Sequence, residues 1–154
     1  MKKNQQGFSI LELVLAAGLF SVFAAGISLA AFQGMNFEQK AVQIQTARQW
    51  AEEGIEAARA IRSQSFDALA DTDGSGLNFS DGKWSLTSDH DSWEGYTRII
   101  MIQSARRDSD GNIVSDGGQE DADMKLVTSQ VTRGDLTVEF STYFSRREIV
   151  PLNP

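Results

Sequence analysis

A single carboxylate stands in the apolar N-terminal stretch of the chain, because Glu12 is the one charged residue in 8–35. An ionised acid in hydrocarbon costs about 3 kcal/mol, and acids at such positions almost always have a partner. Gly7 and Phe8 lie just before it, where the polar leader MKKNQQG meets the apolar stretch. A peptidase that cut between them would create an α-amine at Phe8, four residues from Glu12. We therefore expect Glu12 to have a positively charged partner such as this amine.

The segment that follows this acid is long enough to cross a membrane as a helix. Residues 13–35 contain no charge and no proline, and at ~1.5 Å per residue they span roughly 35 Å, more than the hydrocarbon core of about 30 Å. Lys2 and Lys3 precede the segment, and subtracting leader and segment from the total charge of −7 leaves −8 on residues 36–154. This asymmetry predicts a cytoplasmic N-terminus and an exported body. A plain anchor or an uncleaved signal would share these features.

Small residues recur along the same segment at helical spacing. Gly26, Ala30 and Gly34 are four residues apart, and Gly18 adds to the low-profile surface. Small residues at this interval let helix backbones approach closely within a membrane. The pattern predicts a helix that packs against other helices, although glycine and alanine are also common in membrane helices that pack against nothing.

The seven residues from Gly7 to Leu13 (GFSILEL), after a short basic leader, resemble the class III signal of the type IV pilin family, which includes pseudopilins and minor pilins. The resemblance implies that a prepilin peptidase cleaves between Gly7 and Phe8 and methylates the Phe8 amine. It makes Glu12 the assembly acid of the mature chain. It also implies a leader at 1–7, a transmembrane and filament-core helix at 8–35, and, over 36–154, an amphipathic helix plus an antiparallel sheet head with a loose C-terminal tail.

The function implied by the resemblance is that of a structural subunit, a major or minor pilin, in a type IV pilus-like filament. Its partners would be the prepilin peptidase, other pilin subunits, the pilus assembly platform and the membrane. It would sit in the inner (cytoplasmic) membrane with its N-terminus in the cytoplasm, and later in an extracellular filament or at the cell surface. The alternatives are a pseudopilin of a type II secretion or competence pseudopilus, and a membrane-anchored exported enzyme or binding domain.

Composition argues against several other classes of function. Lys and Arg number 14 against 21 Asp and Glu, and a net charge of −7 disfavours nucleic-acid binding, which needs a basic face. Cysteine is absent and there is one histidine, which excludes thiol catalysis and cysteine zinc sites. No glycine-rich phosphate loop or nucleophile elbow occurs. We therefore expect no enzymatic activity.

The remainder of the chain predicts an α+β fold in which a long N-terminal helix, hydrophobic and then amphipathic, packs on a small antiparallel sheet. An apolar stripe runs from Phe37 to Ile61 at three- and four-residue spacing and needs a cover such as a sheet. Gly54, in the middle of this helix, would permit close approach or a slight bend. Period-two patterns and turn residues predict strands at 83–87, 96–105, 112–115, 124–132 and 136–145, a loop at 71–76, and a Gly/Asp/Ser-rich excursion at 108–123.

One acidic loop could hold a metal ion. Asp108, Asp110, Asn112 and Asp116 offer oxygen ligands of the kind that calcium prefers, and some pseudopilins bind calcium in a head loop. The loop departs from the EF-hand pattern, because Gly111 is fourth where the sixth position needs glycine and the twelfth position lacks Glu. A solvated acidic turn explains the same residues. We therefore expect no cofactor, with calcium at this loop as the alternative.

Overall fold

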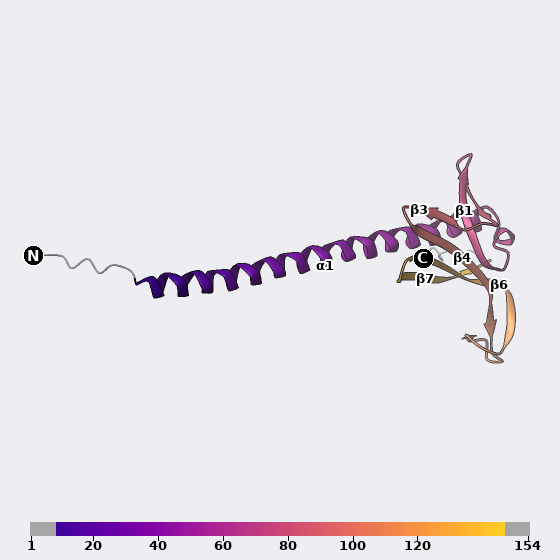
Figure 1. Cartoon of the computed structure of the whole chain (residues 1–154). Coiled ribbons are helices and arrows are strands. Elements are labelled where there is room, and N and C mark those ends of the chain that lie inside the picture. The colour runs from indigo at the N-terminus through magenta and orange to yellow at the C-terminus, as the bar shows by residue number, and fades with distance from the viewer. Residues whose placement is uncertain (1–8, 147–154) are drawn as a thin grey trace, which may run out of the picture. The chain divides into compact units, whose positions relative to one another are not determined.

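The computed structural model describes residues 9–146, apart from the side chain of Asn36. The chain divides into two compact units, Met1–Val42 and Gln43–Pro154, the second of which is the head. The division falls within one long helix, and all the strands belong to the head. Figure 1 shows the helix and the strands in chain order.

Helix α1 runs from Ile10 to Gln64. Its sequence is rich in Ala, Leu, Glu and Gln, which favour helix, and contains no proline to break it. Glu12 lies in the first turn and Arg62 in the last, where each charge interacts favourably with the helix dipole. The helix ends where Ser65 adopts an extended backbone, followed by the short 3-10 helix η1 (Phe66–Ala68).

The strands of the head form one antiparallel sheet with the path β2-β1-β4-β6-β7. The short strands β3 and β5 both pair with β4. This arrangement confirms the predicted α+β fold of a long helix and an antiparallel sheet. The strand bounds are β1 Thr72–Ser80, β2 Lys83–Thr87, β3 Asp91–Trp93, β4 Tyr96–Arg107, β5 Ile113–Val114, β6 Gln119–Arg133 and β7 Leu136–Ser145.

The core of the head lies between the C-terminal part of α1 and the sheet. Ala47 and Ala51 pack near Tyr96 and Val131, and a larger cluster follows along the helix from Ile55 onward. Small side chains on α1 bring its backbone close to the sheet, because a β-carbon on Gly54 would overlap the Ser129 side chain. The prediction of a close approach at Gly54 is therefore confirmed. The larger cluster contains Ile55, Ala57, Ala58, Ile61, Leu69, Leu77, Ile100, Ile102, Val127 and Phe144.

Three expectations are corrected. The predicted loop at 71–76 is wrong, because β1 begins at Thr72 and pairs with β4 through a register shift before Ser75. Gly76 serves there as a close-approach residue, since a β-carbon would overlap the Asp89 carbonyl. The excursion at 108–123 is shorter than predicted, because β6 already begins at Gln119. The apolar stripe on α1 is covered only from Ala47 onward, and Phe37 is 72% exposed.

The remaining strand predictions hold. The patterns at 83–87 and 136–145 correspond to β2 and β7, and the pattern at 96–105 corresponds to β4, which is two residues longer. The short strand predicted at 112–115 is β5. Alternation along β7 gives the expected half-buried face, with Phe144 buried and Glu139 exposed.

Candidate functional site

The processing residues lie at the very start of the chain. Gly7 and Phe8 are outside the described residues, so cleavage between them and methylation of Phe8 stay predictions. The first turn of α1 is defined, because the Ser9 carbonyl accepts the backbone N–H groups of Glu12 at 3.0 Å and Leu13 at 3.2 Å. Glu12 is exposed in this turn, and within residues 9–146 no cation of the same chain forms an ion pair with it. A partner for this carboxylate would come from outside that range.

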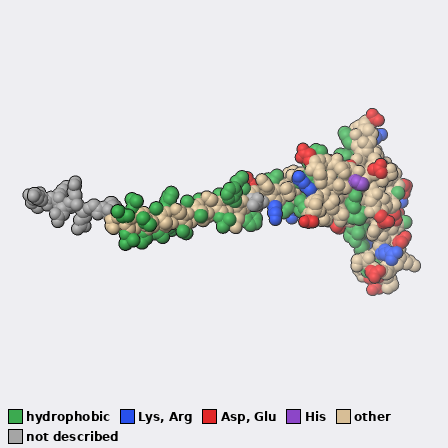
Figure 2. Space-filling model, viewed as in Figure 1, with side chains coloured by type: hydrophobic (Ala, Val, Ile, Leu, Met, Phe, Trp, Pro, Cys, Tyr) green, Lys and Arg blue, Asp and Glu red, His purple; other side chains and the backbone are tan. Residues whose placement is uncertain are grey.

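The N-terminal part of α1 presents an uninterrupted apolar surface. It contains an 18-residue window with mean hydropathy 2.2, none of which is buried within the chain, and is long and apolar enough to cross a membrane. Figure 2 shows hydrophobic side chains crowded along this part of the helix. Phe20 is 75% exposed and Ile10 is 84% exposed, so the segment has no cover of its own.

The hydroxyl groups of two serines in this apolar stretch form hydrogen bonds with backbone carbonyls of α1 itself. Ser21 Oγ donates to the Ala17 carbonyl at 2.8 Å, and Ser28 Oγ donates to the Ala24 carbonyl at 2.9 Å. Back-bonding of this kind removes the need for an outside partner and lets a hydroxyl lie in lipid. The apolar surface is therefore interrupted by charge only at Glu12 in its first turn.

The small residues predicted to pack helices are open in the single chain. Apart from the backbone of α1 itself, no described atom lies within 4 Å of a β-carbon built on Gly18, Gly26 or Gly34, and Ala30 is exposed. Another helix could reach the backbone at these positions. Their role in packing stays a prediction.

A buried arginine fastens α1 to the sheet of the head. Arg98 on β4 is 2% exposed. Its guanidinium donates to the Asp91 carboxylate and, at 3.0 Å, to the Trp50 carbonyl on α1, and it lies 4.6 Å from the Trp50 ring centroid. Sequence reasoning missed this residue, although an arginine inside the apolar run YTRIIMI was a signal for a buried, paired charge. The contact holds the C-terminal part of α1 against the sheet within the head.

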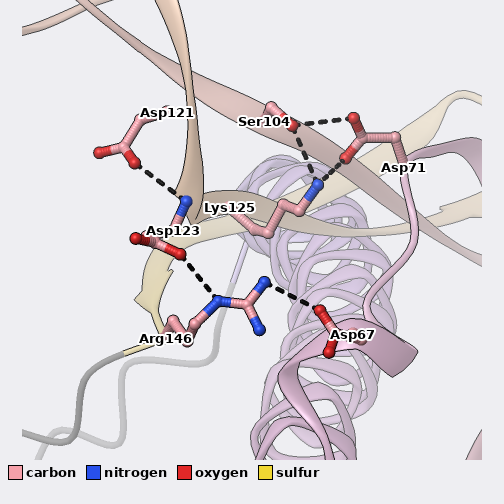
Figure 3. Close-up of polar contacts among 7 residues, drawn as sticks. All are labelled: Asp67, Asp71, Ser104, Asp121, Asp123, Lys125 and Arg146. Atoms are coloured by element: carbon pink, nitrogen blue, oxygen red, sulfur yellow. Dashed lines mark hydrogen bonds and ion pairs between the residues drawn. The ribbon is translucent and has the colours of Figure 1, made fainter.

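A second polar cluster closes the opposite end of the sheet on the segment after α1 (Figure 3). Arg146, just after β7, donates to Asp67 of η1 at 2.8 Å and to Asp123 of β6 at 2.7 Å. Its guanidinium also lies 4.6 Å from the Phe66 ring centroid. A parallel contact joins Lys125 Nζ to Asp71 at 2.7 Å. These pairs hold the end of the sheet in a chain that has no cysteine.

The same pairs set the protonation of their carboxyl groups. The hydrogen bond from Arg146 lowers the pKa of Asp67, and its positive charge adds to the effect. Burial raises the pKa of Asp71, but the hydrogen bonds from Lys125 and Ser104 outweigh it and the net shift is downward. Both carboxylates are therefore charged and paired at neutral pH.

The acidic loop after β4 is organised by its own hydrogen bonds. The Asp108 carboxylate accepts the backbone N–H groups of Asp110 at 3.0 Å and Asn112 at 2.8 Å, and the Asn112 side-chain amide at 3.2 Å. The Asn112 bonds, first from its backbone, lower the pKa of Asp108. Asp116 accepts the N–H of Gly117 instead. Within residues 9–146 no group of three or more Asp, Glu or His side chains could hold a metal ion; calcium binding here stays a prediction.

Residues 2–28 match the family model for the prokaryotic N-terminal methylation motif. No match was found among curated proteins or among solved structures. The matched range contains the predicted cleavage junction and Glu12, as well as most of the apolar surface of α1. The motif supports a pilin-like or pseudopilin-like precursor and implies processing by a prepilin peptidase and assembly with other pilin subunits. The chain carries the N-terminal methylation signal of type IV pilins and pseudopilins.

Proposed function

We propose that this chain is the precursor of a structural subunit in a type IV pilus-like filament. Prepilin peptidase removes residues 1–7 and methylates Phe8, and the mature chain waits in the cytoplasmic membrane with its N-terminus on the cytoplasmic side. The assembly platform then moves it into the filament. One observation carries the proposal: a long, charge-free and exposed helical surface begins with a single acid, Glu12, which has no ion pair within residues 9–146 and lies inside a methylation motif.

Assembly would give Glu12 and the exposed apolar helix the partners that a single subunit lacks. In a lone subunit the Glu12 carboxylate faces lipid without a counter-ion, which is costly. In a filament it can meet the Phe8 amine of a neighbour, while Gly26, Ala30 and Gly34 let the helices approach. Assembly thus supplies both the charge and the cover that the single chain lacks, and the acidic heads face outward.

The experiment is mass spectrometry of the mature N-terminus in cells that contain the maturation enzyme. The expected product begins with N-methylated Phe8. An intact Met1, or a first residue after Met35, would overturn the proposal. Electron microscopy of the same cells then separates the two filament types, because surface filaments containing the chain support a pilus, whereas processing without surface filaments favours a pseudopilin.

A further inference from the structure

Within residues 9–146 the path of the sheet ends in two edge strands, β2 and β7, and the short strands β3 and β5, which each pair with β4 alone, add two shorter edges. Strand β7 is the longer edge and pairs with β6 in unbroken register from Leu136 to Ser145. It contains no proline, no lysine and one charged residue, Glu139. An edge of this length without a bulge or proline is a template on which another strand can add.

An apolar groove runs beside this edge. It has a volume of about 370 Å³ and lies between α1 and β7. Ile55 and Phe140 supply apolar surface, and Glu52 and Glu56 place two carboxylates at its rim. A strand added to β7 would bring every second side chain toward this groove, and apolar side chains would suit it.

Strand β2, at the other edge, has complementary residues. Trp84 and Leu86 pack toward the core on the side of α1, so Lys83 and Ser85 face the opposite side of the sheet, as Glu139 does on β7. Lys83 is exposed, and no ion pair with it exists in the described part of the chain. One edge of the sheet thus carries a base without an ion pair in the described residues, and the other edge carries an acid.

The directions of the two edges also agree. Four successive antiparallel pairings separate β2 from β7, so the two strands run in the same direction. In a filament all subunits point the same way, and β2 of one head would therefore meet β7 of its neighbour as a parallel pair. A contact between two different edges is heterologous and continues from copy to copy, whereas pairing of β7 with β7 would close a dimer.

We propose that β2 of one copy of this chain adds to β7 of the next copy as a parallel strand, with Lys83 opposite Glu139. This register places Ser85 opposite Ser141, and it places Leu86 opposite Thr142 beside the groove. The contact rests on the proposed filament function and adds to it a head-to-head interface separate from the N-terminal helices.

Cysteine cross-linking tests the interface, since the chain has no cysteine of its own. The full chain with Ser85→Cys and Ser141→Cys, assembled in cells and oxidised mildly, should give a ladder of covalent multimers on a non-reducing gel. The matched control pairs Ser85→Cys with Thr142→Cys, whose side chain faces α1, and should give no ladder. Dimers from Ser141→Cys alone would overturn the proposal, because they would mean that β7 pairs with itself.

Charge reversal gives a second readout in the double-cysteine background. Lys83→Glu or Glu139→Lys alone should lower the cross-linked fraction about fivefold, as expected for like charges directly opposite. The double reversal should restore it. Filaments without any ladder would overturn the interface and leave the proposed function standing, whereas a parent chain that is never processed or assembled would overturn both.

Discussion

Gly54 on α1 lies directly over Ser129 on β6, so closely that a β-carbon at position 54 would overlap the serine side chain and lie 3.0 Å from Ile100 Cδ1. Ser129 is fully buried, so the neighbours have little room to move. Gly54→Ala gains about 1 kcal/mol of helix propensity, but overpacking of this kind costs about 1–3 kcal/mol. We expect a net destabilisation of up to about 2 kcal/mol, measured by denaturant unfolding of the full chain in detergent.

The control for this substitution is Gly34→Ala in the same helix. No atom lies within 4 Å of a β-carbon there, so the solubilised single chain should be unchanged or slightly more stable. If Gly54→Ala behaved like Gly34→Ala, the close approach of α1 to β6 would be wrong. The double variant Gly54→Ala, Ser129→Gly should recover part of the loss.

Arg98→Met should destabilise the head by about 3 kcal/mol, because it leaves the partly buried Asp91 carboxylate without its cation and the Trp50 carbonyl without its donor. The tryptophan at position 50 reports unfolding directly by fluorescence. Arg98→Lys keeps the charge but lacks the planar guanidinium with its several N–H donors. Its free energy of unfolding should therefore lie between those of the parent and the methionine variant. A loss below about 0.5 kcal/mol for Arg98→Met, the size of an exposed pair, would contradict this assignment.

The Arg146 cluster predicts sensitivity to acid. The pKa of Asp67 is lowered in the folded chain by its hydrogen bond to Arg146, so its contribution is complete above the unfolded pKa near 4 and is lost as the pH falls through the lower folded value. The midpoint of thermal unfolding should therefore drop between about pH 5 and pH 2. Arg146→Gln should flatten this dependence, with Arg48→Gln, on the exposed side of α1, as the control. If the unfolding midpoint fell equally steeply with pH in both variants, the contact between Arg146 and Asp67 would not be the source of the acid sensitivity.

Glu12→Leu should leave the fold of the head and the cleavage after Gly7 intact. It should reduce filament yield by at least about tenfold, because the Phe8 amine of the neighbouring subunit would lose its partner and an unpaired buried charge costs more than about 1.4 kcal/mol. Glu12→Asp keeps the charge and should retain part of the yield. Sheared filaments quantified by immunoblot, beside the membrane pool, provide the measurement. Undiminished filaments from the leucine variant would show that the carboxylate has no part in assembly.

Much of this fold could be predicted from periodicity. The alternation along β7 and the helical stripe from Ala47 onward both depend on burial against a regular neighbour, which leaves a clear imprint on the sequence. The methylation motif and the apolar helix could also be predicted from the sequence. The helix could be predicted because a membrane-spanning segment needs about 20 consecutive apolar residues.

The missed features depend on contacts between distant residues. The segment at 71–76 reads as a turn because of its glycines, but Gly76 is needed where the backbone passes close to Asp89, and only the tertiary structure shows this. Two hydrogen-bond partners of Arg98, Asp91 and Trp50, lie 7 and 48 residues away in sequence. Phe37 continues the helical apolar pattern and is nevertheless exposed, so the pattern alone does not show where burial of α1 begins.

The end of the sheet is fastened by charges in a chain without sulfur bridges, and this has a consequence for where the protein can mature. Folding of the head requires no thiol oxidase and no oxidising compartment, so a reducing environment leaves it intact. Strong acid, which protonates Asp67, is instead the condition that weakens the contact between Arg146 and Asp67.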